Sequence, residues 1–194
     1  MVEIRLADAG DLEPAVDTLV RAFEDYPLTR LGLDPDGYLD RLAQYHRLFL
    51  REVGLAHGRV WVADDHTAVA SWTTPRTPPG VFAPLAAEFQ EIAGSRAELA
   101  SQYEQAMVLF RPSEPIWFLS VVGVDPERQG RGLGRAVIAP GIAAADEENS
   151  PAFLETQDPA NVAFYESLGF EVLAELDLPA QGPKHWAMRR PPRN

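Results

Sequence analysis

A turn rich in glycine and arginine occupies residues 127–135, and these residue types are suited to binding an anion. The turn follows an apolar run at residues 116–124, whose length and β-branched and aromatic content indicate a buried strand. A helical pattern begins directly after it, at Ala136. A strand, a glycine turn and a helix start together present free backbone N–H groups at a helix N-terminus, where the helix dipole also favours negative charge. We therefore expect this turn to hold a phosphate.

The spacing of the glycines excludes two common phosphate-binding motifs. A dinucleotide fingerprint needs a third glycine five residues after the first, but Arg135 and Val137 occupy those positions. A nucleotide-binding P-loop ends in Gly-Lys-Ser or Gly-Lys-Thr, which this turn lacks. What remains is the pattern Gln-x-x-Gly-x-Gly, formed by Gln129, Gly132 and Gly134.

A second motif lies downstream, after another predicted buried strand at residues 152–156. It has the form Asn-x-x-x-Tyr-x-x-x-Gly-Phe and consists of Asn161, Tyr165, Gly169 and Phe170. The two motifs, in this order and each preceded by a strand, resemble those of the GCN5-related N-acetyltransferase (GNAT) superfamily. The resemblance implies a mixed α/β fold in which a splayed sheet is flanked by helices on both faces.

The resemblance also implies acetyl-CoA as the co-substrate. Its pyrophosphate would lie on the glycine turn, and its pantetheine arm, an extended chain of amides, would pair with the preceding strand. Gly123 would either let the cofactor approach closely or mark a bulge that splays the sheet. The predicted cofactor-binding residues are Val122, Gly123, Val124, Gln129, Gly130, Arg131, Gly132, Leu133, Gly134, Arg135 and Asn161.

Three residues are candidates for proton transfer. By the resemblance, Tyr165 lies beside the cofactor sulfur and is the predicted general acid that protonates the leaving thiolate. The amine must also lose a proton, and the base is either Glu155, at the end of its strand, or Tyr26, acting directly or through water. A backbone N–H at or near Val122 would stabilise the charge on the thioester oxygen.

A closer resemblance covers nearly the whole chain. Residues 22–30, 34–36, 60–65, 72–75 and 151–156 resemble the puromycin N-acetyltransferase family, which acetylates the free amine of an aminonucleoside antibiotic. In that family the tyrosine matching Tyr26 lies at the amine. Residues 76–81, 86–110 and 177–185 depart most from the family, and these are the positions expected to contact substrate. Another amine therefore remains open as the acceptor.

Composition limits the partners. With 17 basic and 29 acidic residues the net charge is −12, which disfavours nucleic acid or an anionic membrane surface and suits a cationic or amine-bearing small molecule. The chain has no cysteine, so neither a thiolate nucleophile nor a cysteine metal site is available, and its four histidines show no metal-ligand spacing. No signal-like or membrane-spanning run occurs, and we expect a cytoplasmic protein without a metal.

The remaining elements predict one domain over residues 1–194. A strand at residues 2–6 precedes a helix at 12–23 that Pro27 ends, and a second helix starts at Asp34-Pro35 and continues to Gly54. The central strand is preceded by a hairpin, a proline-rich loop at 75–84 and two helices. We expect the helix after the glycine turn to kink or end early at Pro140. Further strands and a short helix complete the chain.

Two other functions fit the same motifs. One is acetylation of protein N-termini, which requires a peptide groove, and the other is a sensor that binds acyl-CoA without catalysis. The expected assembly is a monomer or a homodimer.

Overall fold

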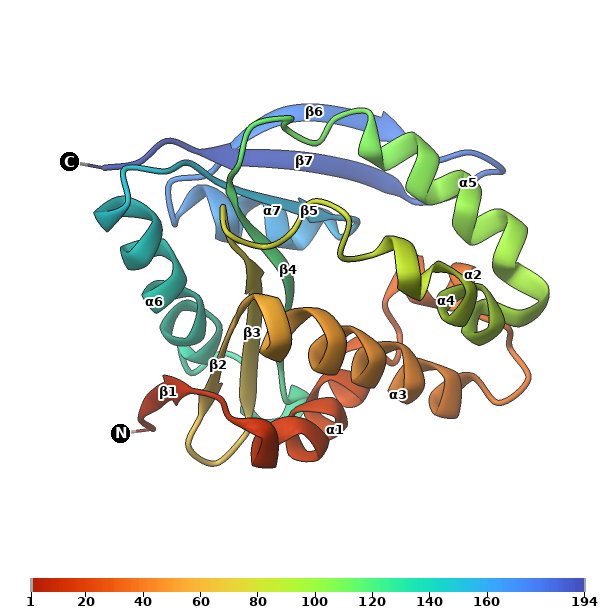
Figure 1. Cartoon of the computed structure of the whole chain (residues 1–194), viewed down its shortest axis with the longest axis horizontal. Coiled ribbons are helices and arrows are strands. Elements are labelled where there is room, and N and C mark those ends of the chain that lie inside the picture. The colour runs from red at the N-terminus through yellow and green to blue at the C-terminus, as the bar shows by residue number, and fades with distance from the viewer. Residues whose placement is uncertain (1, 194) are drawn as a thin grey trace.

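The computed structural model describes residues 2–193, which form a seven-stranded mixed sheet with helices on both faces (Figure 1). The predicted fold class is confirmed. The strands follow one another in space in the order β1-β2-β3-β4-β5-β7-β6. Their bounds are β1 Ile4–Leu6, β2 Arg59–Ala63, β3 Ala68–Thr73, β4 Trp117–Val124, β5 Ala152–Thr156, β6 Glu171–Asp177 and β7 Lys184–Arg190.

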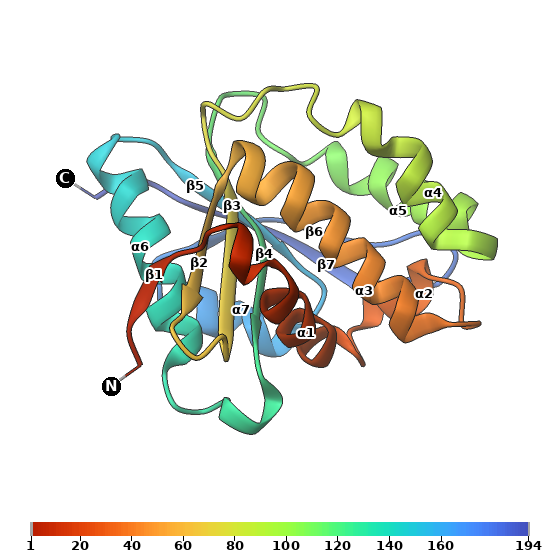
Figure 2. The ribbon, with the colours of Figure 1, turned by 60° about the horizontal axis from the view of Figure 1, so that its bottom comes forward.

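Seven α-helices connect these strands within the described residues. They are α1 Leu12–Phe23, α2 Pro27–Gly32, α3 Tyr38–Phe49, α4 Ala86–Ala93, α5 Ala97–Val108, α6 Leu133–Glu147 and α7 Pro159–Glu166. Figure 1 shows α6 on one side of strands β2 to β4, with α1 and α3 on the other. Figure 2 shows α4 and α5 beyond α3, away from the sheet.

The two faces of the sheet bury separate apolar clusters. On the α6 face, Trp72 and Val137 are fully buried together with residues of β4 and β5. On the opposite face, Leu19 of α1 and Leu42 of α3 pack against the alternate side chains of β2 and β3. Because successive side chains of a strand point to opposite faces, β2 and β3 are buried on both faces, by α6 on one side and by α1 and α3 on the other.

The sheet separates between β4 and β5. These strands are parallel, and their pairing consists of three residue pairs that end with Leu119 opposite Leu154. On the other side of β4, the register with β3 shifts between Ser71 and Trp72, which leaves Ser120 as an extra residue in a bulge. Beyond this bulge, the rest of β4 has no strand partner on its β5 side, which is the predicted splay.

Gly123 has a packing role that the sequence did not predict. A β-carbon here would lie 2.8 Å from Leu19 Cδ2 and 3.0 Å from Ala22 Cβ, both in α1. The missing side chain therefore lets α1 approach the sheet. The bulge predicted at Gly123 lies instead at Ser120.

One predicted helix boundary is confirmed and the next is wrong. The first helix ends at Phe23, before Pro27, as the sequence predicts. Pro27 then occupies the first turn of α2, a short helix that the sequence did not predict, where its missing N–H costs nothing. The next helix starts at Tyr38, after Gly37 with φ of 69°, and not at Asp34. The Asp34 carboxylate instead accepts hydrogen bonds from the backbone N–H groups of Asp36 and Ser95, and so ties the α2–α3 connection to the start of α5.

Helix α6 continues through Pro140 to Glu147, so the early end expected there is also wrong. A β-carbon on the following Gly141 would lie 2.3 Å from the buried indole of Trp72. The Pro140-Gly141 step therefore brings α6 into contact with the sheet without ending the helix.

Substituting Gly123 tests the contact between α1 and β4. Because the new methyl group meets buried atoms of Leu19 and Ala22, we expect Gly123→Ala to lower the free energy of unfolding by about 1–3 kcal/mol in urea denaturation. The control is Gly80→Ala, since no atom lies within 4 Å of a β-carbon there. Equal stability of the two variants would show that α1 does not need this glycine.

Candidate active site

The unpaired edge of β4 presents backbone donors to the gap beside β5. The Asp125 N–H donates to Thr67 O on the β3 side. Because successive N–H groups in a strand point to opposite edges, those of Val122 and Val124 point toward the gap. Val124 O faces the same way and accepts from Gln129 Nε2 at 3.3 Å. This hydrogen bond connects the glycine turn to the end of β4.

The glycine turn leads into α6 as the sequence predicts. Gly130 and Gly132 have φ of 73° and 81°, a left-handed conformation that disfavours any side chain. The first helical hydrogen bond runs from Ala136 N–H to Gly132 O, so the N–H groups of Leu133, Gly134 and Arg135 have no partner within the helix. No acidic residue lies in this first turn. These free N–H groups give the α6 N-terminus the geometry that suits an anion.

The arginines of this turn differ in their surroundings. All three are exposed, and Arg135 also donates from Nη2 to Ser167 Oγ, at 2.8 Å, just after α7. That contact ties the start of α6 to the end of α7. A β-carbon on Gly134 would make ordinary contacts with Phe164 and Val124, so this third glycine is not required by backbone conformation.

Tyr165 of α7 lies in the core beside the gap, with 6% of its surface exposed. Its ring packs against Phe164 and Phe170. Within the described part of the chain its hydroxyl makes no hydrogen bond. Burial, with further contributions from Tyr26 and Asp158, raises its pKa well above the ordinary value. The hydroxyl therefore carries its proton at neutral pH and is free to donate it.

Tyr26, between α1 and α2, reaches across the gap to the end of β5. Its hydroxyl accepts a hydrogen bond from the Gln157 N–H at 2.8 Å and donates to Gln157 Oε1 at 3.0 Å. Thr156 Oγ1 lies 3.3 Å away and also accepts from Asn161 Nδ2, likewise at 3.3 Å. Burial raises the pKa of Tyr26, although the contacts with Thr156 and Gln157 oppose the change. The structure thus brings Tyr26, Tyr165 and Asn161 to one place.

Glu155 is engaged in an ion pair. Arg111 donates from Nε and Nη2 to its two oxygens, each at 2.9 Å, and the Glu155 side chain is 10% exposed. Arg111 also pairs with Glu104. Burial raises the pKa of Glu155 in spite of Arg111, which lowers it. A carboxylate held on both oxygens by a guanidinium is poorly placed to accept the proton of an amine, so the geometry favours Tyr26 over Glu155 at that step.

Three residues that the sequence analysis did not select belong to this cluster: Arg111, Gln157 and His185. His185 is fully buried in β7, and its Nδ1 accepts from Gln157 Nε2 at 2.6 Å. Burial lowers its pKa to about 4, and Arg111 contributes. Gln157 directly follows the strand that carries Glu155, but no local pattern indicates that it contacts His185.

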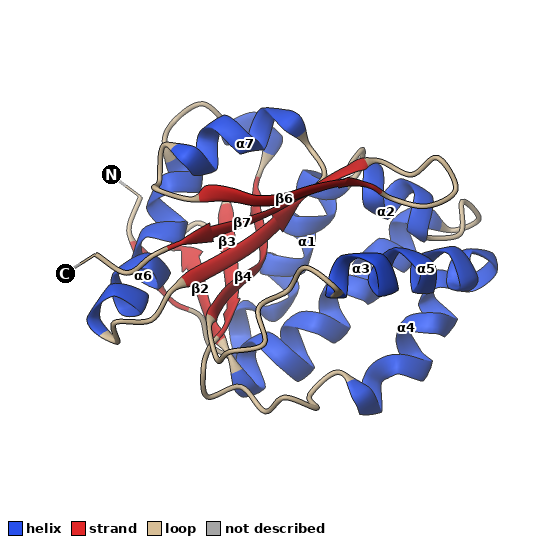
Figure 3. Ribbon diagram, turned by 90° about the horizontal axis from the view of Figure 1, so that it is seen from above, coloured by secondary structure: helices blue, strands red, loops and turns tan. Residues whose placement is uncertain are grey.

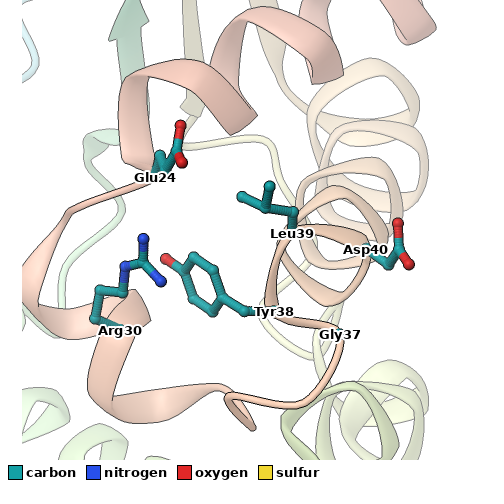
Figure 4. Close-up of a pocket in the computed structure, with 6 residues that line it drawn as sticks. All are labelled: Glu24, Arg30, Gly37, Tyr38, Leu39 and Asp40. Carbon is teal, nitrogen blue, oxygen red and sulfur yellow. The ribbon is translucent and has the colours of Figure 1, made fainter.

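A separate open hollow lies at the surface between the end of α1, α2 and the start of α3. Figure 4 shows Arg30 beside the ring of Tyr38, and the guanidinium carbon is 4.1 Å from the ring centre. Glu24, Gly37, Leu39 and Asp40 complete its lining. Neither Tyr26 nor Tyr165 lines this hollow, so it is distinct from the gap between β4 and β5.

Among residues 2–193, no cluster of acidic, histidine or cysteine side chains is arranged to hold a metal ion. No helix in that range is both long and apolar enough to cross a membrane.

Comparisons with known proteins point to one family. A family model described as the acetyltransferase (GNAT) family matches residues 42–170. Two mycothiol acetyltransferases match shorter segments: that of Kocuria rhizophila is 49% identical over 53 residues, and that of Nocardiopsis dassonvillei is 43% identical over 60. These segments are 26% and 29% of this chain, and each is 18% of the relative. The chain therefore matches about one fifth of the length of these relatives.

Solved structures match over the full chain. A protein from Corynebacterium glutamicum, described as histone acetyltransferase HPA2 and related acetyltransferase, is 26% identical with a TM-score of 0.75 and covers 100% of this chain and 98% of its own. Arylalkylamine N-acetyltransferase 2 from Aedes aegypti is 16% identical with a TM-score of 0.66 and covers 99% of each chain, a likeness of fold alone. The resemblance to the GNAT superfamily is therefore confirmed. The closer resemblance to the puromycin N-acetyltransferase family is not, because the relatives described here carry other names.

Removing Arg111 tests the ion pair with Glu155. Arg111→Met leaves a buried carboxylate without its partner, and we expect the free energy of unfolding to fall by about 3 kcal/mol. The double variant Arg111→Met/Glu155→Gln removes the uncompensated charge and should recover most of this loss. A double-mutant cycle from urea denaturation measures the coupling. Additive effects would mean that the pair does not stabilise the fold.

Proposed function

Because this chain belongs to the acetyltransferase (GNAT) family and is an acyltransferase, we propose that it transfers an acetyl group from acetyl-CoA directly to a primary amine of a small molecule. One observation supports the proposal: the edge of β4 that β5 leaves unpaired leads into the free N–H groups of α6, and Tyr26, at the end of β5, is near enough to Tyr165 to contribute to its raised pKa. An anion-binding turn at one end of a slot and two phenols at the other suit a thioester with a phosphorylated tail.

The slot, by which we mean the gap between β4 and β5 together with the glycine turn, suits coenzyme A in one orientation, with the pyrophosphate at the turn and the thioester between the strands. The N–H groups of Leu133, Gly134 and Arg135 would bind the pyrophosphate, with Arg131 adding positive charge. The amide arm would then pair with Val122 and Val124 as an added strand, which supplies the partner that β5 does not provide. This pairing would put the thioester near Val122, just beyond Leu119, the last residue of β4 that pairs with β5.

The chemistry follows from that placement. The amine nitrogen attacks the thioester carbon, so that a C–N bond forms as the C–S bond breaks. The Val122 N–H would stabilise charge on the thioester oxygen, an interaction of about 3 kcal/mol in comparable sites. The Tyr165 hydroxyl would give its proton to the departing thiolate. With no cysteine in the chain, a thioester-linked enzyme intermediate is excluded, which favours direct transfer.

Tyr26 would act on the amine side of the slot. Its raised pKa keeps it a neutral phenol, so it would orient the amine by accepting a hydrogen bond from the amine N–H, while a water molecule takes up the proton that the nitrogen loses. This is the water-mediated form of the role predicted for Tyr26. Glu155 is held in its ion pair with Arg111 and would not contact the nitrogen of the acceptor amine directly.

For the acceptor we propose an aminonucleoside such as puromycin, because the resemblance to that family includes residues 22–30 around Tyr26. A second candidate is the acceptor of the mycothiol acetyltransferases, which match about a quarter of this chain. A thiol-release assay with acetyl-CoA would compare puromycin, the mycothiol precursor, simple primary amines and a peptide N-terminus. Turnover of the peptide alone would contradict a small-molecule acceptor, and no turnover at all would favour a sensor.

Replacing each tyrosine separates the two proposed roles. Tyr165→Phe should lower kcat by about 10²-fold because it removes the proton donor for the thiolate. Tyr26→Phe should also lower turnover, while the dissociation constant of coenzyme A in isothermal titration stays near the wild-type value. Unchanged turnover in Tyr165→Phe would exclude that residue from the chemistry. Lost coenzyme A binding in Tyr26→Phe would place Tyr26 at the cofactor and not at the amine.

A glycine pair tests the phosphate site. Gly132→Val should weaken acetyl-CoA binding at least tenfold, since its side chain would extend from the turn that receives the pyrophosphate. Gly37→Val is a matched control, because Gly37 has a similar φ of 69°, also has open space around it, and lies at the start of α3. Equal cofactor affinity in both variants would argue against this turn as the phosphate site.

A further inference from the structure

A chain of buried polar groups extends from Tyr26 away from the slot and into the core. Gln157 is 6% exposed and His185 is fully buried. The Tyr26 hydroxyl donates to Gln157 Oε1 at 3.0 Å, and Gln157 Nε2 donates to His185 Nδ1 at 2.6 Å. His185 Nε2 lies 3.8 Å from Glu155 Oε1 and makes no hydrogen bond within the described structure. These polar groups thus form a series that runs from the Tyr26 hydroxyl, which is proposed to contact the amine, to the Glu155 carboxylate.

The environment of His185 selects one tautomer. The charged groups that face the ring are Glu155, Arg111 and Glu104, and burial keeps the ring neutral with a single N–H. A proton on Nε2 is attracted by the nearby Glu155 carboxylate, whereas a proton on Nδ1 would oppose the Gln157 N–H₂ group. The neutral ring therefore carries its proton on Nε2 and offers Nδ1 as an acceptor.

This tautomer determines the orientation of the Gln157 amide. Because a bare Nδ1 accepts only from the amide N–H₂, the amide oxygen must point the other way, to Tyr26. Tyr26 then directs its hydroxyl proton to that oxygen while it accepts from the Gln157 backbone N–H. With the amide reversed, two N–H groups would face the phenol oxygen, and its own proton would turn away from Gln157, either to Thr156 Oγ1 at 3.3 Å or into the gap toward the nucleophile.

We propose that Gln157 and His185 are positioning residues that hold the Tyr26 hydroxyl proton away from the acceptor amine, so that the phenol oxygen presents a lone pair to it. The inference rests on the proposed function for the part played by the amine. Glu155 then acts through His185 as the group that fixes the tautomer, which gives this carboxylate a role other than that of a base.

A spectroscopic experiment tests the hydrogen-bond chain without any acceptor. In protein labelled with ¹⁵N-histidine, the ring nitrogen shifts of His185, assigned by their loss in His185→Asn, should show the proton on Nε2. Gln157→Glu replaces the donor with a carboxylate oxygen, so the proton should move to Nδ1 or the ring should become charged. Met107→Leu is the control, because Met107 Sδ lies 3.6 Å from the same amide nitrogen and the change keeps the bulk of the side chain. A wild-type His185 protonated on Nδ1 would overturn the inference.

Kinetics test the consequence for the amine. His185→Leu removes the acceptor and frees the amide to turn, so kcat at saturating amine should fall about tenfold with an unchanged KM for acetyl-CoA. His185→Asn offers an oxygen close to the position of Nδ1 and should retain most of the activity, as should Met107→Leu. Equal losses in His185→Leu and His185→Asn that follow their melting temperatures would show a structural role and contradict the inference.

The two measurements separate this inference from the proposed function. A wild-type protein that acetylates no amine, yet carries the His185 proton on Nε2, contradicts the proposed function and leaves the hydrogen-bond chain supported. Normal turnover with the proton on Nδ1 contradicts the inference alone.

Discussion

The parting of β4 from β5 is the constraint on which the site depends. The edge of β4 beyond Leu119 presents N–H and C=O groups that β5 does not pair, and such an edge favours an extended chain of amides that can be added as a strand. The two strands are parallel, so their carboxyl ends lie at the same edge of the sheet. Each is followed by a helix of the site: α6 begins after β4, and α7, with Tyr165, begins after β5.

The opposite wall of the site comes from the first part of the chain. Gly123 lets α1 approach β4, and this close packing carries the end of α1 and Tyr26 to the far end of β5. Figure 3 shows α7 beside β6 and β7, with α2 and α5 near the other end of these strands. The acceptor side of the slot is therefore built from elements that are distant in sequence, whereas the cofactor side is built from consecutive ones.

This difference explains what the sequence could predict. The strand, glycine turn and helix around Gly132 form a continuous local pattern, and their backbone geometry agrees with it. The end of α1 before Pro27 was also predictable, but α2 was not, because a proline that ends one helix can equally occupy the first turn of the next, and only the tertiary context shows which. The contact between Gln157 and His185 depends on the pairing of β5 with β7, in which Thr156 lies opposite Trp186. No local periodicity encodes that pairing, so these two residues were not identified beforehand.

The hydrogen bonds of Tyr26 to a residue 131 positions later have a consequence for biosynthesis. A nascent chain that has emerged from the ribosome only as far as residue 150 already contains the anion-binding turn and most of the sheet. It lacks Tyr165, the partners of Tyr26 and the strand that carries His185. Translation thus completes the β4 edge, the glycine turn and the start of α6 before it supplies the residues that meet at Tyr26.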